Sequence, residues 1–277
     1  MEEFVSHRKI GISKSILLCL GVLFLYDFID SFVWGYAEAA MSEEAFERTS
    51  YYFFDSIICA VLCFLFFFLY LGLRWGFKQS KTKSYHPFWI LSQSIIITLG
   101  ISGLTNLWLD FSYSKLSHIP FVASSIKSYD ATWEGIEKEP YLYVLLAVVV
   151  LGPIVEEFMF RGIIFRLLEE QNVYLALILS SLFFGLWHME FIQSVYTVFL
   201  GFATVIVYFR TQSIVYPMLI HILYNFLSTL PPAWDNTMFY HWLNKIELFM
   251  ILPCFLLLFF MIKSNKKESF YIKNKLS

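Results

Sequence analysis

The chain alternates long apolar stretches with short polar segments, which is the pattern of membrane-spanning helices. A helix rises 1.5 Å per residue, so about 20 apolar residues cross the roughly 30 Å hydrocarbon layer of a bilayer. Eight stretches have the required length and low charge, at 12–34, 53–73, 88–109, 141–165, 173–191, 194–210, 213–230 and 245–262. The sequence therefore predicts an all-α fold, a polytopic membrane helical bundle of about eight transmembrane helices.

Composition supports this prediction. Hydrophobic residues make up 58% of the 277 residues and charged residues only 15%, against about 45–50% apolar and 25% charged in soluble domains. The net charge of −2 gives no indication of nucleic-acid binding. The four cysteines lie within apolar stretches and form no disulfide framework, and the first stretch is too long for a cleaved signal peptide.

The distribution of basic residues predicts the orientation in the membrane. With eight spans and a cytoplasmic N-terminus, 15 of the 20 lysines and arginines fall on the cytoplasmic side, as the positive-inside rule requires. Both termini are then cytoplasmic. The connection at 110–140 mixes charges with aromatic residues, which is typical of an interfacial helix or of a loop near a substrate entrance.

Three polar clusters interrupt the apolar stretches of the second half. A charged side chain at the centre of a span costs about 2.5–3.5 kcal/mol on insertion scales, so each one requires a partner or a function. The clusters are Glu156 and Glu157 with Arg161, then Phe184 with His188, then His221 with Asn225.

In the first cluster, Glu157 and Arg161 are four residues apart and can pair along one helix face. Glu156 points about 100° away from Glu157, so it is left to face a cavity, where a carboxylate without an adjacent cation suits a general base or acid. The alternative is a salt-bridged helix end at the cytoplasmic interface.

The fourth and fifth stretches predict a helical hairpin that turns near Gln171 and Asn172. About 16 residues separate this turn from Glu156 on one side and from His188 on the other, so antiparallel packing places both at similar depth, where they can share a water molecule. Gly185, one turn before His188, allows a close approach of another backbone. The alternative for His188 is a packed histidine bonded to a carbonyl.

His221 and Asn225 are four apart on the seventh stretch, which places two hydrogen-bond donors on one helix face. Such a pair can hold a developing oxyanion. It can also link helices, as buried polar residues in membranes do. For Asp27, Asp30 and Asp55, an interfacial or capping role is favoured over catalysis.

These motifs resemble the family of CaaX proteases and bacteriocin-processing enzymes, also called the Abi or type II CAAX prenyl endopeptidase-like family. That family carries Glu-Glu-x-x-x-Arg, Phe-x-x-x-His and His-x-x-x-Asn motifs on successive membrane helices. All three occur here in order, within 141–230. The resemblance divides the chain into a three-span N-terminal region (1–140), a catalytic core (141–230), and a last span with a basic cytoplasmic tail (231–277).

The resemblance implies an intramembrane endopeptidase. Glu156 and His188 would activate water, His221 and Asn225 would hold the oxyanion, and Glu157 and Arg161 would support the motif helix. The family has been described both as glutamate-dependent and as metal-dependent. A metal-free site is favoured because Asn225 is a poor zinc ligand but a good oxyanion donor. The alternative is zinc held by Glu156, Glu157, His188 and His221.

The implied partners are a peptide or membrane-protein substrate and the lipid bilayer, without nucleic acid. The expected location is a bacterial plasma membrane, with a role in bacteriocin or peptide processing or in self-immunity. Alternatives are a non-catalytic immunity protein or membrane partner and, less favoured, a transporter. The sequence does not select a substrate, a cleavage site or an oligomeric state.

Overall fold

The long apolar stretches form helices, because a backbone in hydrocarbon must satisfy its hydrogen bonds within the segment. The computed structural model describes residues 11–76, 86–169, 171–230, 234 and 237–275, and these contain no β-strand. The helices are α1 (Ile12–Ala40), α2 (Glu43–Arg48), α3 (Tyr51–Gly76), α4 (Pro87–Phe111), α5 (Pro120–Lys138), α6 (Tyr141–Val144), α7 (Gly152–Glu157), α8 (Phe165–Glu169), α9 (Val173–Trp187), α10 (Phe191–Thr211), α11 (Val215–Ser228) and α12 (Met238–Lys275).

The predicted polytopic bundle is confirmed, and the count of eight spans is approximate. In the described part of the chain, six helical segments are long and apolar enough to cross a membrane. The helices α9 and α11 are apolar but hold only 15 and 14 residues. The fifth predicted span, 173–191, ends early because Met189 adopts a left-handed φ of 54° and Glu190 caps the next helix, its side chain accepting from Gln193 N at 3.0 Å.

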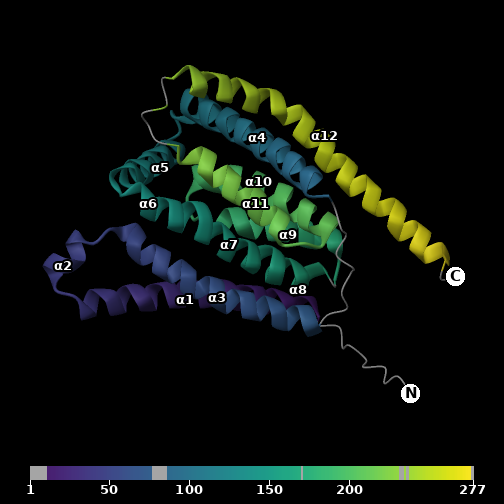
Figure 1. Cartoon of the computed structure of the whole chain (residues 1–277), viewed down its shortest axis with the longest axis horizontal. Helices are drawn as coiled ribbons and strands as arrows, with labels where there is room; N and C mark the ends of the chain where they lie inside the picture. Colours follow the sequence, from purple (N-terminus) through teal and green to yellow (C-terminus); the bar gives the residue numbers. More distant parts are fainter. Residues whose placement is uncertain (1–10, 77–85, 170, 231–233, 235–236, 276–277) are drawn as a thin grey trace.

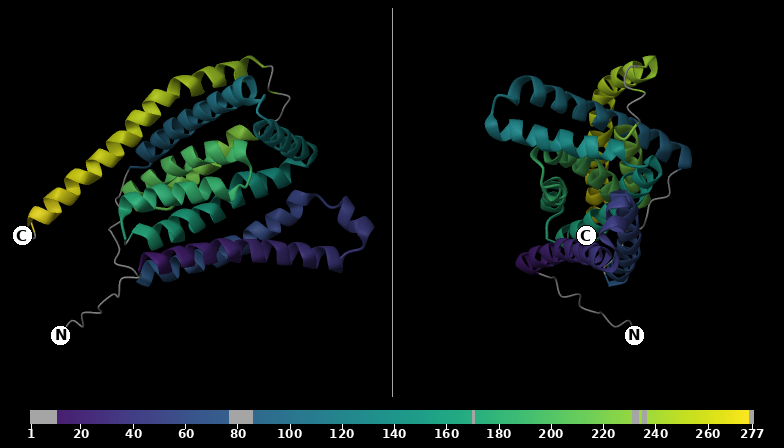
Figure 2. Two further views of the ribbon diagram at one scale, coloured as in Figure 1. Left: turned by 180° about the vertical axis from the view of Figure 1, so that it is seen from behind. Right: turned by 90° about the vertical axis from the view of Figure 1, so that its left-hand side faces the viewer.

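The helices form three groups (Figures 1 and 2). The pair α1 and α3 lies on one side of the bundle and the pair α4 and α12 on the other, with α6 to α11 between them. The start of α1 and the end of α12 lie at the opposite end of the molecule from α2 and α5. The three predicted polar clusters therefore occupy the helices at the centre.

The fourth span is one continuous helix from Tyr141 to Glu169 whose winding changes in two π-helical segments. The π-helical segments η2 (Leu145–Leu151) and η3 (Phe158–Ile164) flank the single α-helical segment α7. A π segment turns the following side chains relative to a regular α-helix and leaves local backbone groups for other partners. Glu156 and Glu157 end α7, so both lie between two such changes.

The connection at 110–140 contains a helix. After α4 and the short π segment η1 (Ser112–Leu116), α5 begins at Pro120. Its buried residues Val122, Ser125, Ile126 and Tyr129 recur at helical spacing, so one face packs on α10. Ser125 fixes this contact, because its hydroxyl donates to Glu190 and accepts from Ile192 N.

Close packing of α9 against α10 depends on glycine. A Cβ built on Gly185 would lie 2.6 Å from the carbonyl oxygen of Ser194 and against Val198. The predicted close approach at Gly185 is therefore made by the backbone of α10, as small residues permit between membrane helices.

Gly185→Ala should lower stability by about 1–3 kcal/mol, the usual cost of overpacking, because the backbone of α10 cannot move away cheaply. Thermal unfolding of the purified protein in detergent measures this change. Gly21→Ala is the matched control, since a Cβ there meets nothing within 4 Å. Equal unfolding temperatures for the two variants would contradict the packing argument.

Candidate active site

Residues from four helices line one cavity at the centre of the bundle. The cavity measures about 100 Å³, room for several water molecules. Glu156, His188, His221 and Asn225 all contribute to its wall. The structure thus brings together the four residues that the sequence predicts as catalytic.

The predicted pair of Glu157 and Arg161 is present and is fully buried. Arg161 Nε lies 3.1 Å from Glu157 Oε2, and both side chains are 0% exposed. Arg161 also donates to Thr204 Oγ1 and, at 3.4 Å, to Gly201 O, and its guanidinium lies 4.4 Å from the Phe184 ring centroid. The arginine therefore ties the motif helix to α9 and α10.

His221 lies between the two glutamates. Its Nδ1 is 3.0 Å from Glu157 Oε1, and its Nε2 is 3.8 Å from Glu156 Oε2. Glu157 pairs with Arg161 through its other oxygen, and a carboxylate only accepts hydrogen bonds, so Nδ1 of His221 is the donor to Glu157. Glu157 therefore orients the imidazole ring, as second carboxylates do for working histidines.

Glu156 is the carboxylate that faces the cavity. Its Oε2 atom is buried and has no hydrogen-bond partner within the described part of the chain. A buried carboxylate oxygen without a partner is costly. Such an oxygen is available to accept a proton or a hydrogen bond from a molecule in the cavity.

His188 caps the end of α9 instead of lying inside a span as expected, because the helix ends at Trp187. Its Nδ1 is 3.1 Å from Gln193 Nε2. An amide nitrogen only donates, so Nδ1 accepts and the neutral ring carries its proton on Nε2. This Nε2 is buried without a hydrogen-bond partner in the described residues, so it can donate to a molecule in the cavity.

Asn225 donates one amide hydrogen to Val148 O at 2.8 Å. Val148 belongs to the π segment η2, so the asparagine also links two helices, the alternative role that its position suggested. A carboxamide nitrogen carries two hydrogens. The second remains available to an oxygen in the cavity.

Sequence reasoning missed three residues that shape the site. Gln193 orients His188, Thr204 holds Arg161, and Trp133 of α5 closes the cavity. Thr204 is a polar residue in an apolar stretch and Gln193 lies between two such stretches, so their signal was weak. None of Asp27, Asp30 and Asp55 lines the cavity.

In the alternative zinc set, Glu157 would have to leave its present partners. Both oxygens of Glu157 are engaged, one by Arg161 and one by His221. Across residues 11–76, 86–169, 171–230 and 237–275, no three His, Cys, Asp or Glu side chains are grouped to hold a metal ion. Whether the site works with or without a metal stays a prediction.

Comparison with known proteins identifies this region. Residues 138–227 match the family described as Type II CAAX prenyl endopeptidase Rce1-like. Over these residues the chain is similar to that family. The matched residues carry all three polar clusters and the cavity that they line, apart from Ser228 and the residues that α5 contributes.

A curated relative supports the assignment. Over 135 residues, the chain is 30% identical to the protein named "Putative membrane peptidase YdiL" of Bacillus subtilis (strain 168), which covers 44% of this chain. The chain spans about half (54%) of that relative's length. No solved structure matches the chain.

Proposed function

We propose that this integral membrane protein is an intramembrane endopeptidase that hydrolyses a peptide bond of a peptide or membrane-anchored protein. One observation carries the proposal. Two buried polar atoms without hydrogen-bond partners in the described chain, Glu156 Oε2 and His188 Nε2, belong to the wall of one cavity that can hold water. One is an acceptor and the other a donor, which is what positioning and deprotonating a water molecule requires.

The reaction follows from these roles. A water molecule accepts from His188 Nε2–H and donates to Glu156, which takes its proton as the oxygen attacks the substrate carbonyl carbon. The carbonyl becomes an oxyanion. When the carbon–nitrogen bond breaks, the protonated Glu156 gives its proton to the leaving amine, and Glu156 is restored as a carboxylate.

The oxyanion is held by His221 and Asn225. Asn225 supplies its second amide N–H, the one that does not donate to Val148 O. His221 donates through Nδ1 to Glu157, so it offers a second N–H at Nε2 only as a doubly protonated ring. Both groups are fixed before substrate binds, and such preorganised donors stabilise developing charge effectively.

The test is cleavage of fluorescent peptide libraries by the purified protein in lipid vesicles, before and after exhaustive chelation. Activity that survives chelation is the expected result, since no step requires a metal. If activity is lost and returns only with stoichiometric zinc, the metal and not the pair Glu156 and His188 activates the water molecule.

Asn225→Ala should lower kcat about 100- to 1000-fold and leave residual cleavage, because loss of one oxyanion donor has this typical effect. Ser228→Ala is the matched control, a neighbouring cavity residue on α11 that is exposed and bonds only to Asn225 O in the described chain. If Asn225→Ala instead left kcat unchanged and altered only unfolding, its role would be the link to Val148.

The proposed location is a bacterial plasma membrane with both termini in the cytoplasm, on the strength of the basic residues. The α5 side of the cavity then faces the outer side, because α5 lies at the end of the molecule away from the start of α1. Reporter fusions after α12 and within 112–119 test the orientation; a reporter after α12 that is active outside the cell would reverse it.

A further inference from the structure

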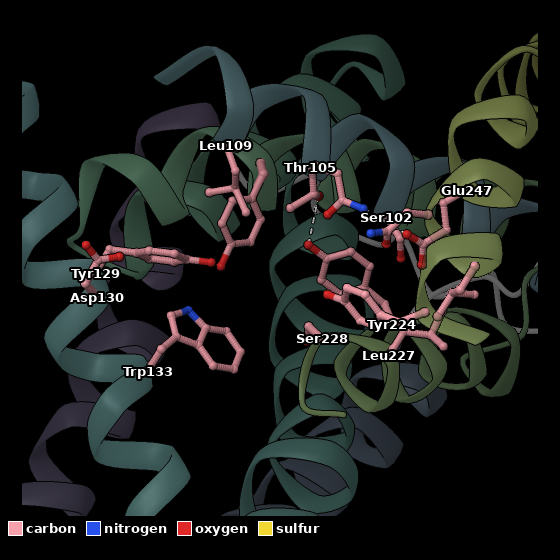
Figure 3. Close-up of a pocket in the computed structure, with 15 residues that line it drawn as sticks. Ser102, Thr105, Leu109, Tyr129, Asp130, Trp133, Tyr224, Leu227, Ser228 and Glu247 are labelled. Atoms are coloured by element: carbon pink, nitrogen blue, oxygen red, sulfur yellow. Dashed lines mark hydrogen bonds between the residues drawn. The ribbon is translucent and has the colours of Figure 1, made fainter. Parts of the chain in front are cut away.

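A second cavity adjoins the candidate active site, between α4, α5, α11 and α12 (Figure 3). It measures about 260 Å³ and shares the wall residues Trp133, Tyr196, Tyr224 and Ser228 with the active-site cavity. This volume is near the lower end of ligand pockets, roughly 300 Å³, and suits one side chain better than a whole peptide. A group bound here lies beside the cavity that Glu156 and His188 line.

Glu247 of α12 lines this second cavity and is only 4% exposed. Its Oε2 accepts from Asn106 Nδ2 at 2.8 Å. Among the residues that the structure describes, no lysine, arginine or histidine lies within ion-pair distance of it. Burying a carboxylate without a cation is costly, so its place in a cavity wall points to a ligand that supplies the missing charge.

The remaining walls suit a cation. Tyr129 and Trp133 project from α5 toward the side where Tyr224 lies (Figure 3), and Tyr224 is fixed by a 2.9 Å hydrogen bond with Thr105. Aromatic faces attract cations, and the planar guanidinium of arginine stacks on them better than an ammonium does. Asp130, which accepts from Tyr113, adds a second carboxylate on the α5 side.

We propose that this cavity binds a cationic side chain of the substrate, arginine in preference to lysine, and that Glu247 is the specificity-determining residue. The inference rests on the proposed peptidase function for the identity of the ligand as part of a peptide. The cation site itself is independent of cleavage. Because this cavity adjoins the one that Glu156 and His188 line, it would bind a substrate residue close to the cleaved bond.

Binding of benzamidine to the purified full-length protein tests the cation site without any cleavage. Benzamidine is a planar aromatic cation, and benzamide is its neutral counterpart. We expect benzamidine to bind and benzamide to bind at least 10-fold more weakly. Glu247→Gln should weaken benzamidine about 10- to 100-fold, the range for losing one contact with a charged group. The control Glu134→Gln changes an exposed carboxylate of α5 outside the cavity and should have no effect.

A second variant keeps the test decisive if Glu247→Gln does not fold. Leu227→Trp adds a ring to the cavity wall from α11 and leaves Glu247 unchanged, so it should also weaken benzamidine at least 10-fold. Equal binding of benzamidine and benzamide, or benzamidine binding that neither variant alters, would overturn the proposal.

Peptide pairs that differ only in arginine against citrulline then test specificity. The wild-type protein should cleave the arginine peptide with a kcat/KM about 10- to 100-fold higher, and Glu247→Gln should bring this ratio close to one. If neither peptide is cleaved while benzamidine binding still requires Glu247, the peptidase proposal fails and the cation site stands. If both are cleaved equally and benzamidine does not bind, the cation site fails and the peptidase stands.

Discussion

Glu156→Gln should fold as the wild-type protein does and lose nearly all peptide cleavage. Glutamine keeps the size and the hydrogen-bonding oxygen of the side chain but cannot take the proton of the attacking water. General base catalysis contributes about 100- to 10,000-fold, so we expect kcat to fall by an amount in this range. Single-turnover cleavage in lipid vesicles, with thermal unfolding of the same preparation, measures both quantities.

The matched control is Asp55→Asn, which removes another half-buried carboxylate of a membrane helix that does not line the cavity. It should retain cleavage within a few-fold of wild type. Undiminished cleavage by Glu156→Gln would reject the mechanism, and a large loss in Asp55→Asn would show that a carboxylate outside the cavity takes part.

Arg161→Ala should destabilise the protein by about 3–5 kcal/mol, the usual cost of removing one partner of a buried ion pair. The loss leaves Glu157 charged and 0% exposed, and it also removes the contacts with Gly201 and Thr204. The yield of folded protein and its unfolding temperature should both fall. Activity should fall as well, because Glu157 then orients His221 less firmly.

Arg48→Ala provides a control with the same spacing. Arg48 and Glu44 are also four residues apart, at 2.6 Å, but their side chains are 78% and 74% exposed, so their pairing contributes little. The double variant Glu157→Gln with Arg161→Gln removes both buried charges and should recover part of the lost stability. Full stability of Arg161→Ala would disprove the structural role of the pair.

The helical architecture and the grouping of the polar residues around one cavity could be predicted because both depend on short-range patterns. Apolar stretches predict spans, and the spacing of Glu157 and Arg161 predicts an ion pair on one face. The equal depth of Glu156 and His188 followed from counting residues from the turn, where Asn172 caps α9 by accepting from Tyr174 N at 2.9 Å. Whether these residues perform the proposed catalytic roles stays a prediction, as does the division of the chain at 140 and 230.

The remaining details depend on contacts between distant segments. The π segments around α7 could not be predicted, since η2 is stabilised by the bond from Asn225, 77 residues away. The left-handed Met189, which ends α9 early, depends on the cap from Glu190. Glu247 carried no motif, and only the packing of α12 on α4 places it in a cavity with Asn106.

The shortness of α9 has a consequence for the surrounding lipid. Its exposed residues Ile178, Leu182 and Leu186 recur every four positions and form an apolar stripe on the outer surface, yet 15 residues span only about 22 Å. This is less than the roughly 30 Å thickness of the hydrocarbon layer, and a bilayer relieves such hydrophobic mismatch by local thinning. We expect headgroups and water to lie closest to the protein beside His188. We expect a transmembrane substrate of the proposed peptidase to lose part of its contact with hydrocarbon in this thinned annulus, so that its helix end unwinds there at the lowest cost.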